Sequence, residues 1–372
     1  MSEIIEKIAA EIRARGAIPF ARFMELALYC PDCGFYEKEK DNVGKYGDFF
    51  TSVSVGDLFG QLLAFQFADW FEGTSETPQR QSGTAEMPLR IVEAGAHDAQ
   101  LARDILTWLK AHRPEIFHRL QYCIVEPSAR RRGWQQESLK EFQGKVKWAA
   151  EISELKSTLD SSEAIIFSNE LLDAMPVHRL GWDAKEKKWF EWGVSRNGDT
   201  FEWCRLPARS EHVSHFTVHE QLFDLLPDGY AVEMSPDAED WWRSAAQVLA
   251  HGRLMAIDYG FTADEQFSPS RVNGTLRAYR RHQVTGDLLA DPGEQDLTAH
   301  VNFFAIQAVG ESAGLRTEIF CPQPQFLTRI VEKIFKQSGS FGEWSAKQSR
   351  QLQTLTHPEH LGRAFRVLVQ SK

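Results

Sequence analysis

The sequence lacks any run of 18 apolar residues, the length at which a segment becomes a candidate membrane-spanning helix, so no membrane span is expected. It also lacks the features of a targeting segment. The first sixteen residues, MSEIIEKIAAEIRARG, carry glutamate at positions 3, 6 and 11, which excludes a secretory signal and is unlike an acid-poor transit peptide. We therefore expect a cytoplasmic protein of the bacterial type.

An excess of basic residues is missing as well. The chain has 42 Lys and Arg against 52 Asp and Glu, a net charge of −10. A protein that coats DNA or RNA needs a basic face, so no nucleic-acid partner is expected, whereas a cationic substrate is compatible with this balance. The 372 residues are enough for two domains, or for one α/β domain with insertions.

Cysteine is scarce and unpatterned, with five residues at positions 30, 33, 123, 204 and 321. Cys30 and Cys33 form a single CxxC pair. No second pair and no nearby histidine completes a four-ligand zinc site, so no metal is expected. A redox role for this pair stays open, but a simple turn in a reducing compartment is favoured.

The rest of the chain is organised around residues 89–106, LRIVEAGAHDAQLARDIL. Residues 89–92 predict a buried strand, Glu93-Ala94-Gly95 a turn, and the following apolar spacing a helix. In such a unit the helix N-terminus offers unpaired N–H groups to a ligand. Residues 122–126 predict a second strand ending in Glu126, an acid in position to accept hydrogen bonds from ribose hydroxyls. Together these features predict a cofactor that contains adenosine.

Five further strands are predicted at residues 146–149, 164–168, 253–257, 315–320 and 364–369. Alternation with helices predicts an α/β fold with a Rossmann-like seven-stranded sheet. Polar groups at the carboxyl ends of parallel strands line the ligand crevice, so Glu93, Glu126, Asn169 and Glu170 are expected to converge on one rim. A single carboxylate at a strand end is more commonly a solvated loop residue, so the prediction depends on the four together.

The segment 177–232 has a different character from the predicted core. Alternating aromatic residues flank the sequence SRNGD at 195–199, a pattern typical of a β-hairpin. We predict an inserted β-hairpin subdomain, whose aromatic residues form either its own core or a partner surface. The predicted boundaries around it are an N-terminal helical segment at 1–75, a polar linker at 76–88, and an α/β core at 89–176 and 233–372.

The string GDFFTS at residues 47–52 precedes a helix predicted from about residue 55 to 71. Gly47 permits backbone conformations that other residues avoid, and Asp48, Thr51 and Ser52 supply hydrogen-bond acceptors. Two interpretations stay open: a plain cap of the following helix, or a loop that contributes to the ligand site.

Several long strings resemble the MidA family of S-adenosylmethionine-dependent methyltransferases: PFARFM at 19–24, GDFFTS at 47–52, VEPS at 125–128, NELLDAMPV at 169–177, IDYG at 257–260 and DLTAHVNF at 296–303. The resemblance implies a class I methyltransferase fold and S-adenosyl-L-methionine as cofactor. It also implies a protein arginine as substrate, with a respiratory complex subunit among the candidate partners. The oligomeric state and the role of the hairpin stay open.

The same resemblance assigns roles to residues. It places Glu93, Gly95 and Glu126 in the cofactor site, and Asn169 and Glu170 at the reacting end. Asn169 and Ser52 are also expected to bind the cofactor, and Asp48, expected to be catalytic, lies in a loop expected to close over it. We expect Glu170 to orient a guanidinium with Asp173 as its helper, because paired carboxylates fix guanidinium geometry. Asp173 could equally stabilise the first turn of its own helix.

The glycine turn departs from the family pattern. That pattern resembles Glu-x-Gly-x-Gly-x-Gly, and here His97 and Ala99 stand in place of the second and third glycines. Glycine allows positive φ and a close approach of backbone to ligand. Two functions are therefore carried forward: an active methyltransferase, or a catalytically impaired protein of the same fold that serves as a binding or complex-assembly factor. A nicotinamide dehydrogenase is not expected, because a second mononucleotide-binding half is missing.

Overall fold

The structure is a computed structural model that describes residues 2–38, 51–75, 87–214, 225–262, 265, 267–268, 271–280, 283–337, 339–358, 361 and 365–372. Contacts between residues divide the chain into two compact units. The central-sheet unit comprises residues 50–172, 240–260 and 305–372, and the accessory unit comprises residues 1–49, 173–239 and 261–304.

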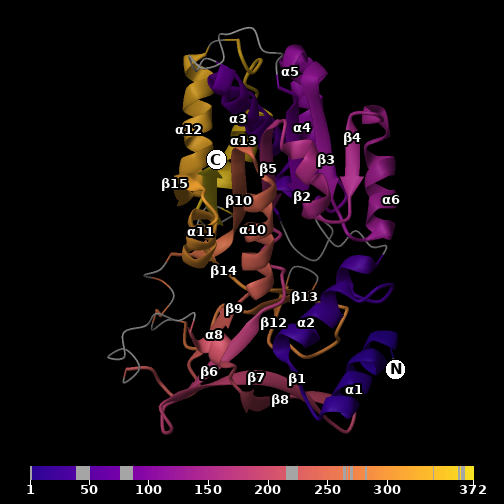
Figure 1. Ribbon diagram of the computed structural model, residues 1–372, viewed down its shortest axis with the longest axis vertical. Helices are drawn as coiled ribbons and strands as arrows, with labels where there is room; N and C mark the ends of the chain where they lie inside the picture. Colours follow the sequence, from indigo (N-terminus) through magenta and orange to yellow (C-terminus); the bar gives the residue numbers. More distant parts are fainter. Residues whose placement is uncertain are drawn as a thin grey trace. The chain divides into compact units, whose positions relative to one another are not determined.

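The central-sheet unit is built on a mixed sheet, with strands in the order β15, β16, β10, β5, β2, β3, β4 (Figure 1). In chain order their bounds are β2 Leu89–Ala94, β3 Leu120–Val125, β4 Val146–Ala149, β5 Glu163–Asn169, β10 His251–Phe261, β15 Arg316–Pro322 and β16 Phe365–Ser371. Pairing is parallel from β10 to β4 and antiparallel where β16 meets β10 and β15. The predicted α/β class with a multi-stranded sheet is confirmed.

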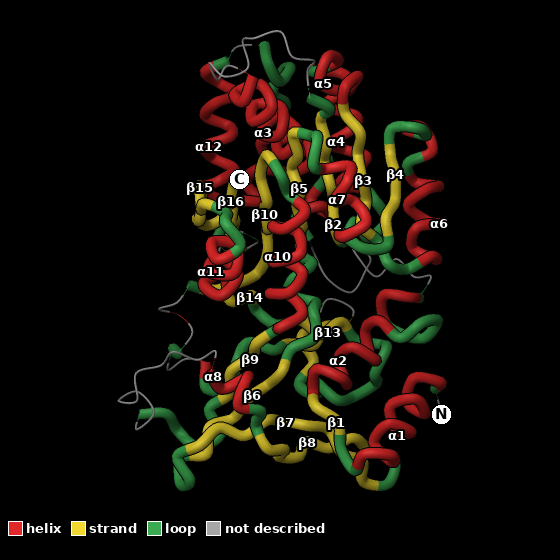
Figure 2. Tube along the Cα trace, viewed as in Figure 1, coloured by secondary structure: helices red, strands yellow, loops and turns green. Residues whose placement is uncertain are grey.

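Helices cover this sheet, as the red tubes of Figure 2 show for the same unit. Helices α3 (Leu58–Ser75), α4 (Gln100–His112), α12 (Gln323–Lys336) and α13 (Ala346–Thr356) contact one another and share one buried apolar cluster with the strands. The remaining helices with residues in this unit are α5 Pro114–Arg119, α6 Ala129–Ser138, α7 Lys156–Leu159, α10 Pro236–Val248 and α11 Phe303–Ser312. Among the described residues, no helix is both long and apolar enough to cross a membrane.

The accessory unit contains two smaller sheets. The first has the order β1 (Ile18–Pro19), β7 (Lys188–Asn197), β6 (His178–Asp183), β9 (Ala231–Met234), with β8 (Thr200–Pro207) also paired to β7. The second pairs β11 with its two neighbours, and its bounds are β11 Arg277–Arg280, β12 Gln283–Thr285 and β13 Asp296–Thr298. The remaining α-helices and β-strands that lie wholly within the described part of the unit are α1 Glu3–Arg15, α2 Phe20–Tyr29, α8 Ser210–Ser214 and β14 Val301–Asn302.

The predicted domain boundaries differ from this division at the N-terminal segment. The helices at the start of the chain were expected to form a segment separate from the β-rich segment. In the structure α1, α2 and the β-rich segment all belong to the accessory unit. The physical reason is a set of contacts between segments far apart in the sequence. Ile18 pairs with Val194 of β7, and Phe20 on α2 packs against Trp203 of β8 at 5.0 Å between ring centroids. The hairpin strands β7 and β8 therefore form part of a larger sheet. Residues 76–86 of the predicted linker lie outside the described residues.

Candidate functional site

The turn after β2 keeps the backbone shape of a glycine-rich turn although two of the expected glycines are missing. The φ angles are 77° at Gly95, 47° at His97 and 66° at Ala99. Positive φ is uncommon for residues with a Cβ, and it costs roughly 1–2 kcal/mol at each. The turn is closed by a hydrogen bond from the Ala99 N–H to the Ala96 carbonyl, and the Asp98 carboxylate accepts from the Gln100 N–H at 3.0 Å. The substitutions at 97 and 99 thus leave this backbone shape in place.

Glycine at position 95 is favoured by packing as well as by its φ. A Cβ added there would lie 3.0 Å from Cδ1 of Leu171, which follows β5. Ala94 of β2 pairs with Ser168 of β5 on one side and with Val125 of β3 on the other. The carboxyl ends of these three parallel strands therefore meet at one edge of the sheet, and Glu93, Glu126, Asn169 and Glu170 lie on or directly after these ends.

Glu93 is a buried carboxyl group at this edge, with 2% of its surface exposed. The Tyr122 hydroxyl donates a hydrogen bond to its Oε2 at 2.7 Å. Burial raises the pKa of Glu93 to about 8; the Tyr122 hydrogen bond opposes this shift, and the negative charge of Asp98 adds to it. At neutral pH the Glu93 side chain is therefore mostly protonated in this structure.

Glu126 lies at the end of β3, almost fully buried, with its carboxylate already bonded. Oε1 accepts from the Ser128 N–H at 3.0 Å, and Oε2 accepts from Gln135 at 3.1 Å and pairs with Arg131 at 3.2 Å. Gln135 also donates to the His97 carbonyl at 3.0 Å, so one side chain joins the glycine-like turn to Glu126. Gln135 was not predicted from the sequence. Its only signal was a place on the helix that follows Glu126.

A second group of predicted residues meets where β5 ends. Glu170 has a φ of 53°, and its Oε1 accepts from the Ser52 N–H at 3.2 Å and from the Asn169 amide at 3.1 Å. The Ser52 hydroxyl donates to Gln323 at 3.2 Å. Thr51, not Ser52, caps the short turn that follows, because its hydroxyl accepts from the Ser54 N–H. The structure thus brings together Ser52, Asn169 and Glu170, a grouping that was not predicted.

Asp258 holds this second group in place, and sequence reasoning gave it no role. It is fully buried in the last half of β10, and its Oδ2 accepts from the N–H groups of Leu171 and Leu172 at 3.2 and 2.9 Å. These bonds fix the backbone that follows Glu170. The side-chain oxygen Oδ1 of Asn169 is buried without a hydrogen-bond partner.

Asp173 belongs to the accessory unit, where it is 5% exposed. Its carbonyl accepts from the Ala299 N–H at 2.9 Å. Asp296 of the same unit accepts from the Tyr36 hydroxyl at 2.6 Å. Burial raises the pKa of Tyr36 well above its usual value, and the negative charges of Asp296 and Asp173 add to the shift. Two buried carboxylates therefore help to raise the pKa of the same tyrosine. Asp48 lies outside the described residues.

Comparison with known proteins identifies similar chains. Residues 62–321 match the family of S-adenosyl-L-methionine-dependent methyltransferases. The fold is similar to that of a Burkholderia thailandensis protein solved bound to S-adenosyl-homocysteine, at 30% identity and a TM-score of 0.82, covering 99% of this chain and 92% of that one. A relative from Mus musculus is 25% identical, and the match covers 98% of this chain and 83% of the relative. A relative from Drosophila melanogaster is also 25% identical, and the match covers 84% of this chain and 70% of the relative. They are named the mitochondrial protein arginine methyltransferase NDUFAF7 and its homolog.

Proposed function

Because the chain belongs to the family of S-adenosyl-L-methionine-dependent methyltransferases, we propose that it methylates an arginine nitrogen of a protein substrate. The protein is an enzyme of this class, and S-adenosyl-L-methionine is its cofactor. When bound, this cofactor supplies a methyl group carried on a positively charged sulfur. The choice of arginine is supported by the names of the mouse and fly relatives. A respiratory complex subunit as the partner stays a prediction.

The residues at the edge of the central sheet fit the cofactor. The buried Oδ1 of Asn169 needs a hydrogen-bond donor, which the hydroxyl or ammonium groups of the cofactor can provide. Oε1 of Glu126 accepts the Ser128 N–H and retains a second lone pair for a ribose hydroxyl. We assign Glu93, Gly95, Glu126, Asn169 and Ser52 to cofactor binding on these grounds and on the resemblance.

The observation that carries arginine as the substrate is the carboxylate that directly follows β5. This carboxylate belongs to Glu170, and Asp173 comes three residues later in the chain. A guanidinium matches carboxylates in charge and in paired hydrogen-bond geometry. The net charge of −10 also favours a cationic substrate.

In the proposed reaction these carboxylates orient the guanidinium so that one nitrogen lone pair faces the methyl carbon. Alignment and exclusion of water from this line of approach are the main contributions the protein makes. The methylated guanidinium keeps its positive charge and loses one proton. We assign Glu170 to hold the guanidinium and to accept this proton, and Asp173 to position it.

A second function is favoured by one observation. His97 and Ala99 hold positive φ angles without being glycine, and the His97 ring adds bulk beside the turn. A turn that holds its shape but crowds the ligand is compatible with a binding or complex-assembly factor that has lost turnover.

Isothermal titration with S-adenosyl-L-methionine and with S-adenosyl-homocysteine separates the two functions. We expect micromolar binding that is lost in Glu126→Ala and retained in Glu137→Ala, which changes an exposed glutamate on α6, the helix that follows Glu126. If wild type gives no heat at millimolar ligand and His97→Gly restores binding, the binding-factor function is correct instead.

The substrate is tested with a labelled methyl donor and a library of arginine-containing peptides, followed by acid hydrolysis and identification of the labelled amino acid. We expect methylarginine from wild type, and about a 100-fold or greater loss in Glu170→Gln with cofactor binding kept. Label on another amino acid would refute arginine while leaving the methyltransferase assignment intact.

A further inference from the structure

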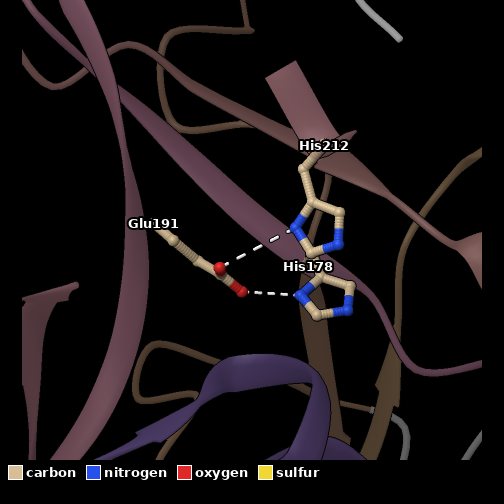
Figure 3. A group of neighbouring side chains, drawn as sticks. All are labelled: His178, Glu191 and His212. Atoms are coloured by element: carbon tan, nitrogen blue, oxygen red, sulfur yellow. Dashed lines mark hydrogen bonds and ion pairs between the residues drawn. The ribbon is translucent and has the colours of Figure 1, made fainter. Parts of the chain in front are cut away.

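Three metal-ligating side chains converge on one face of the larger accessory sheet (Figure 3). His178 is on β6, Glu191 on β7 and His212 on α8. Leu180 pairs with Glu191, so His178, two residues earlier, lies diagonally across on the same face of the sheet. Figure 3 shows the Glu191 carboxylate directed toward both imidazole rings. Within the described part of the chain, no other group of three such side chains comes as close together.

The distances show that only some of the polar atoms in this cluster have a hydrogen-bond partner. Oε1 of Glu191 lies 2.6 Å from Nδ1 of His178, which is a hydrogen bond. Oε2 of Glu191 lies 3.8 Å from Nδ1 of His212, which is too long for one. His212 is 6% exposed, and its Nδ1 is buried without a hydrogen-bond partner. A buried polar atom of this kind is destabilising unless a ligand satisfies it.

The ligand types in the cluster suit a cation. A neutral imidazole can direct a nitrogen lone pair at a metal, and Glu191, 2% exposed, supplies the negative charge. A proton shared between His178 and Glu191 would leave the His212 nitrogen unsatisfied, whereas a metal ion satisfies all three groups.

We propose that His178, Glu191 and His212 bind a divalent transition-metal ion, with zinc as the first choice. Two imidazoles and one carboxylate form a ligand set typical of zinc, with a fourth position taken by water. Zinc–ligand bonds of about 2.0–2.2 Å in a tetrahedron separate ligand atoms by about 3.3 Å. The observed 2.6 and 3.8 Å lie on either side of this value, so small side-chain rotations open one gap and close the other.

The ion would join three segments of the accessory unit. Helix α8 is only five residues long, and a ligand from it would tie it to β6 and β7. All three ligands lie in the accessory unit, whereas the residues assigned to the cofactor lie in the central-sheet unit. The ion therefore acts on the stability of the accessory unit rather than in methyl transfer. Binding to the folded chain alone raises its free energy of unfolding.

The test uses the full chain, stripped with a chelator and dialysed. Zinc affinity is measured by competition with a chromophoric chelator, and Co²⁺ is added separately as a spectroscopic probe. We expect one ion per chain, the visible absorption of tetrahedral Co²⁺, and a higher thermal unfolding midpoint with zinc. Glu191→Gln and His212→Asn should each weaken zinc binding on the order of 100-fold or more.

The matched control is His251→Gln, which removes an exposed histidine of the central-sheet unit and should bind zinc as wild type does. Equal affinity in the control and in His212→Asn would overturn the proposal, and the His178–Glu191 contact would then be a hydrogen bond alone. If circular dichroism shows that both cluster variants are unfolded, the wild-type Co²⁺ spectrum decides, since the absence of tetrahedral bands would refute the site.

Discussion

Glu93 is a carboxyl group that the folded chain keeps mostly protonated at neutral pH, because burial raises its pKa to about 8 from a usual 4.5. Between these two values the folded state binds more protons than the unfolded state. The contribution of Glu93 to stability is thus fully present below about pH 4.5 and is lost as pH rises toward about 8.

Replacing Glu93 with glutamine should remove this pH dependence. We expect wild type to lose stability relative to Glu93→Gln as pH rises from about 5 to about 8, by at most about 1.4 kcal/mol per pH unit. Urea unfolding of both proteins across this range measures the difference. Parallel stability curves would show that Glu93 is ionised throughout.

The two thiols of the CxxC pair, Cys30 and Cys33, are a second place where burial changes the pKa of a side chain. Cys33 donates to Cys30 at 3.1 Å between sulfurs, both residues are buried, and Lys7 lies 3.5 Å from the Cys30 sulfur. Burial, with the Cys30 contact, raises the pKa of Cys33 to about 11. Only about 0.1% of this thiol is ionised at pH 8.

Native Cys33 should therefore react with iodoacetamide at least about 100-fold more slowly than in the urea-unfolded chain, because the thiolate is the reactive form. Peptide mass spectrometry after timed labelling measures the rate at this residue. Fast labelling of the native protein would instead favour the redox role left open by the sequence.

At the scale of elements, the important link is the contact of α6 with the turn after β2. Gln135 on α6 donates both to the His97 carbonyl and to Glu126. Gln135→Leu keeps the volume of the side chain and removes both bonds. We expect cofactor binding to weaken on the order of 10-fold by isothermal titration, since partners that orient a ligand residue have effects of this size. Gln136→Leu, on the exposed face of the same helix, is the control and should bind normally.

The elements themselves were largely predictable. The strand expected at residues 146–149 is observed at Val146–Ala149, and the helix expected at about residues 55–71 is observed at Leu58–Ser75, because the local pattern of apolar residues determines such segments. Pairing between distant segments was not predictable. Contacts between residues far apart in the sequence leave no local pattern. Three such cases are the pairing of Ile18 with β7, the hydrogen bond from Gln135 to His97 and the cluster around His178.

At the scale of the whole molecule, the chain has two compact units with separate buried clusters. Differential scanning calorimetry should resolve two transitions. S-adenosyl-homocysteine should raise the midpoint of the transition of the central-sheet unit, and zinc that of the accessory unit. A single transition with equal calorimetric and van't Hoff enthalpies would show instead that the units unfold as one.

The place of β16 in the central sheet has a consequence for folding during synthesis. This strand lies between β10 and β15 but follows both in the chain. While a ribosome is still making the segment at 365–371, the newly made β10 and β15 have no strand to pair with on their facing edges, and unpaired edges promote aggregation. The nascent chain therefore passes through a stage in which a molecular chaperone would have a defined apolar target.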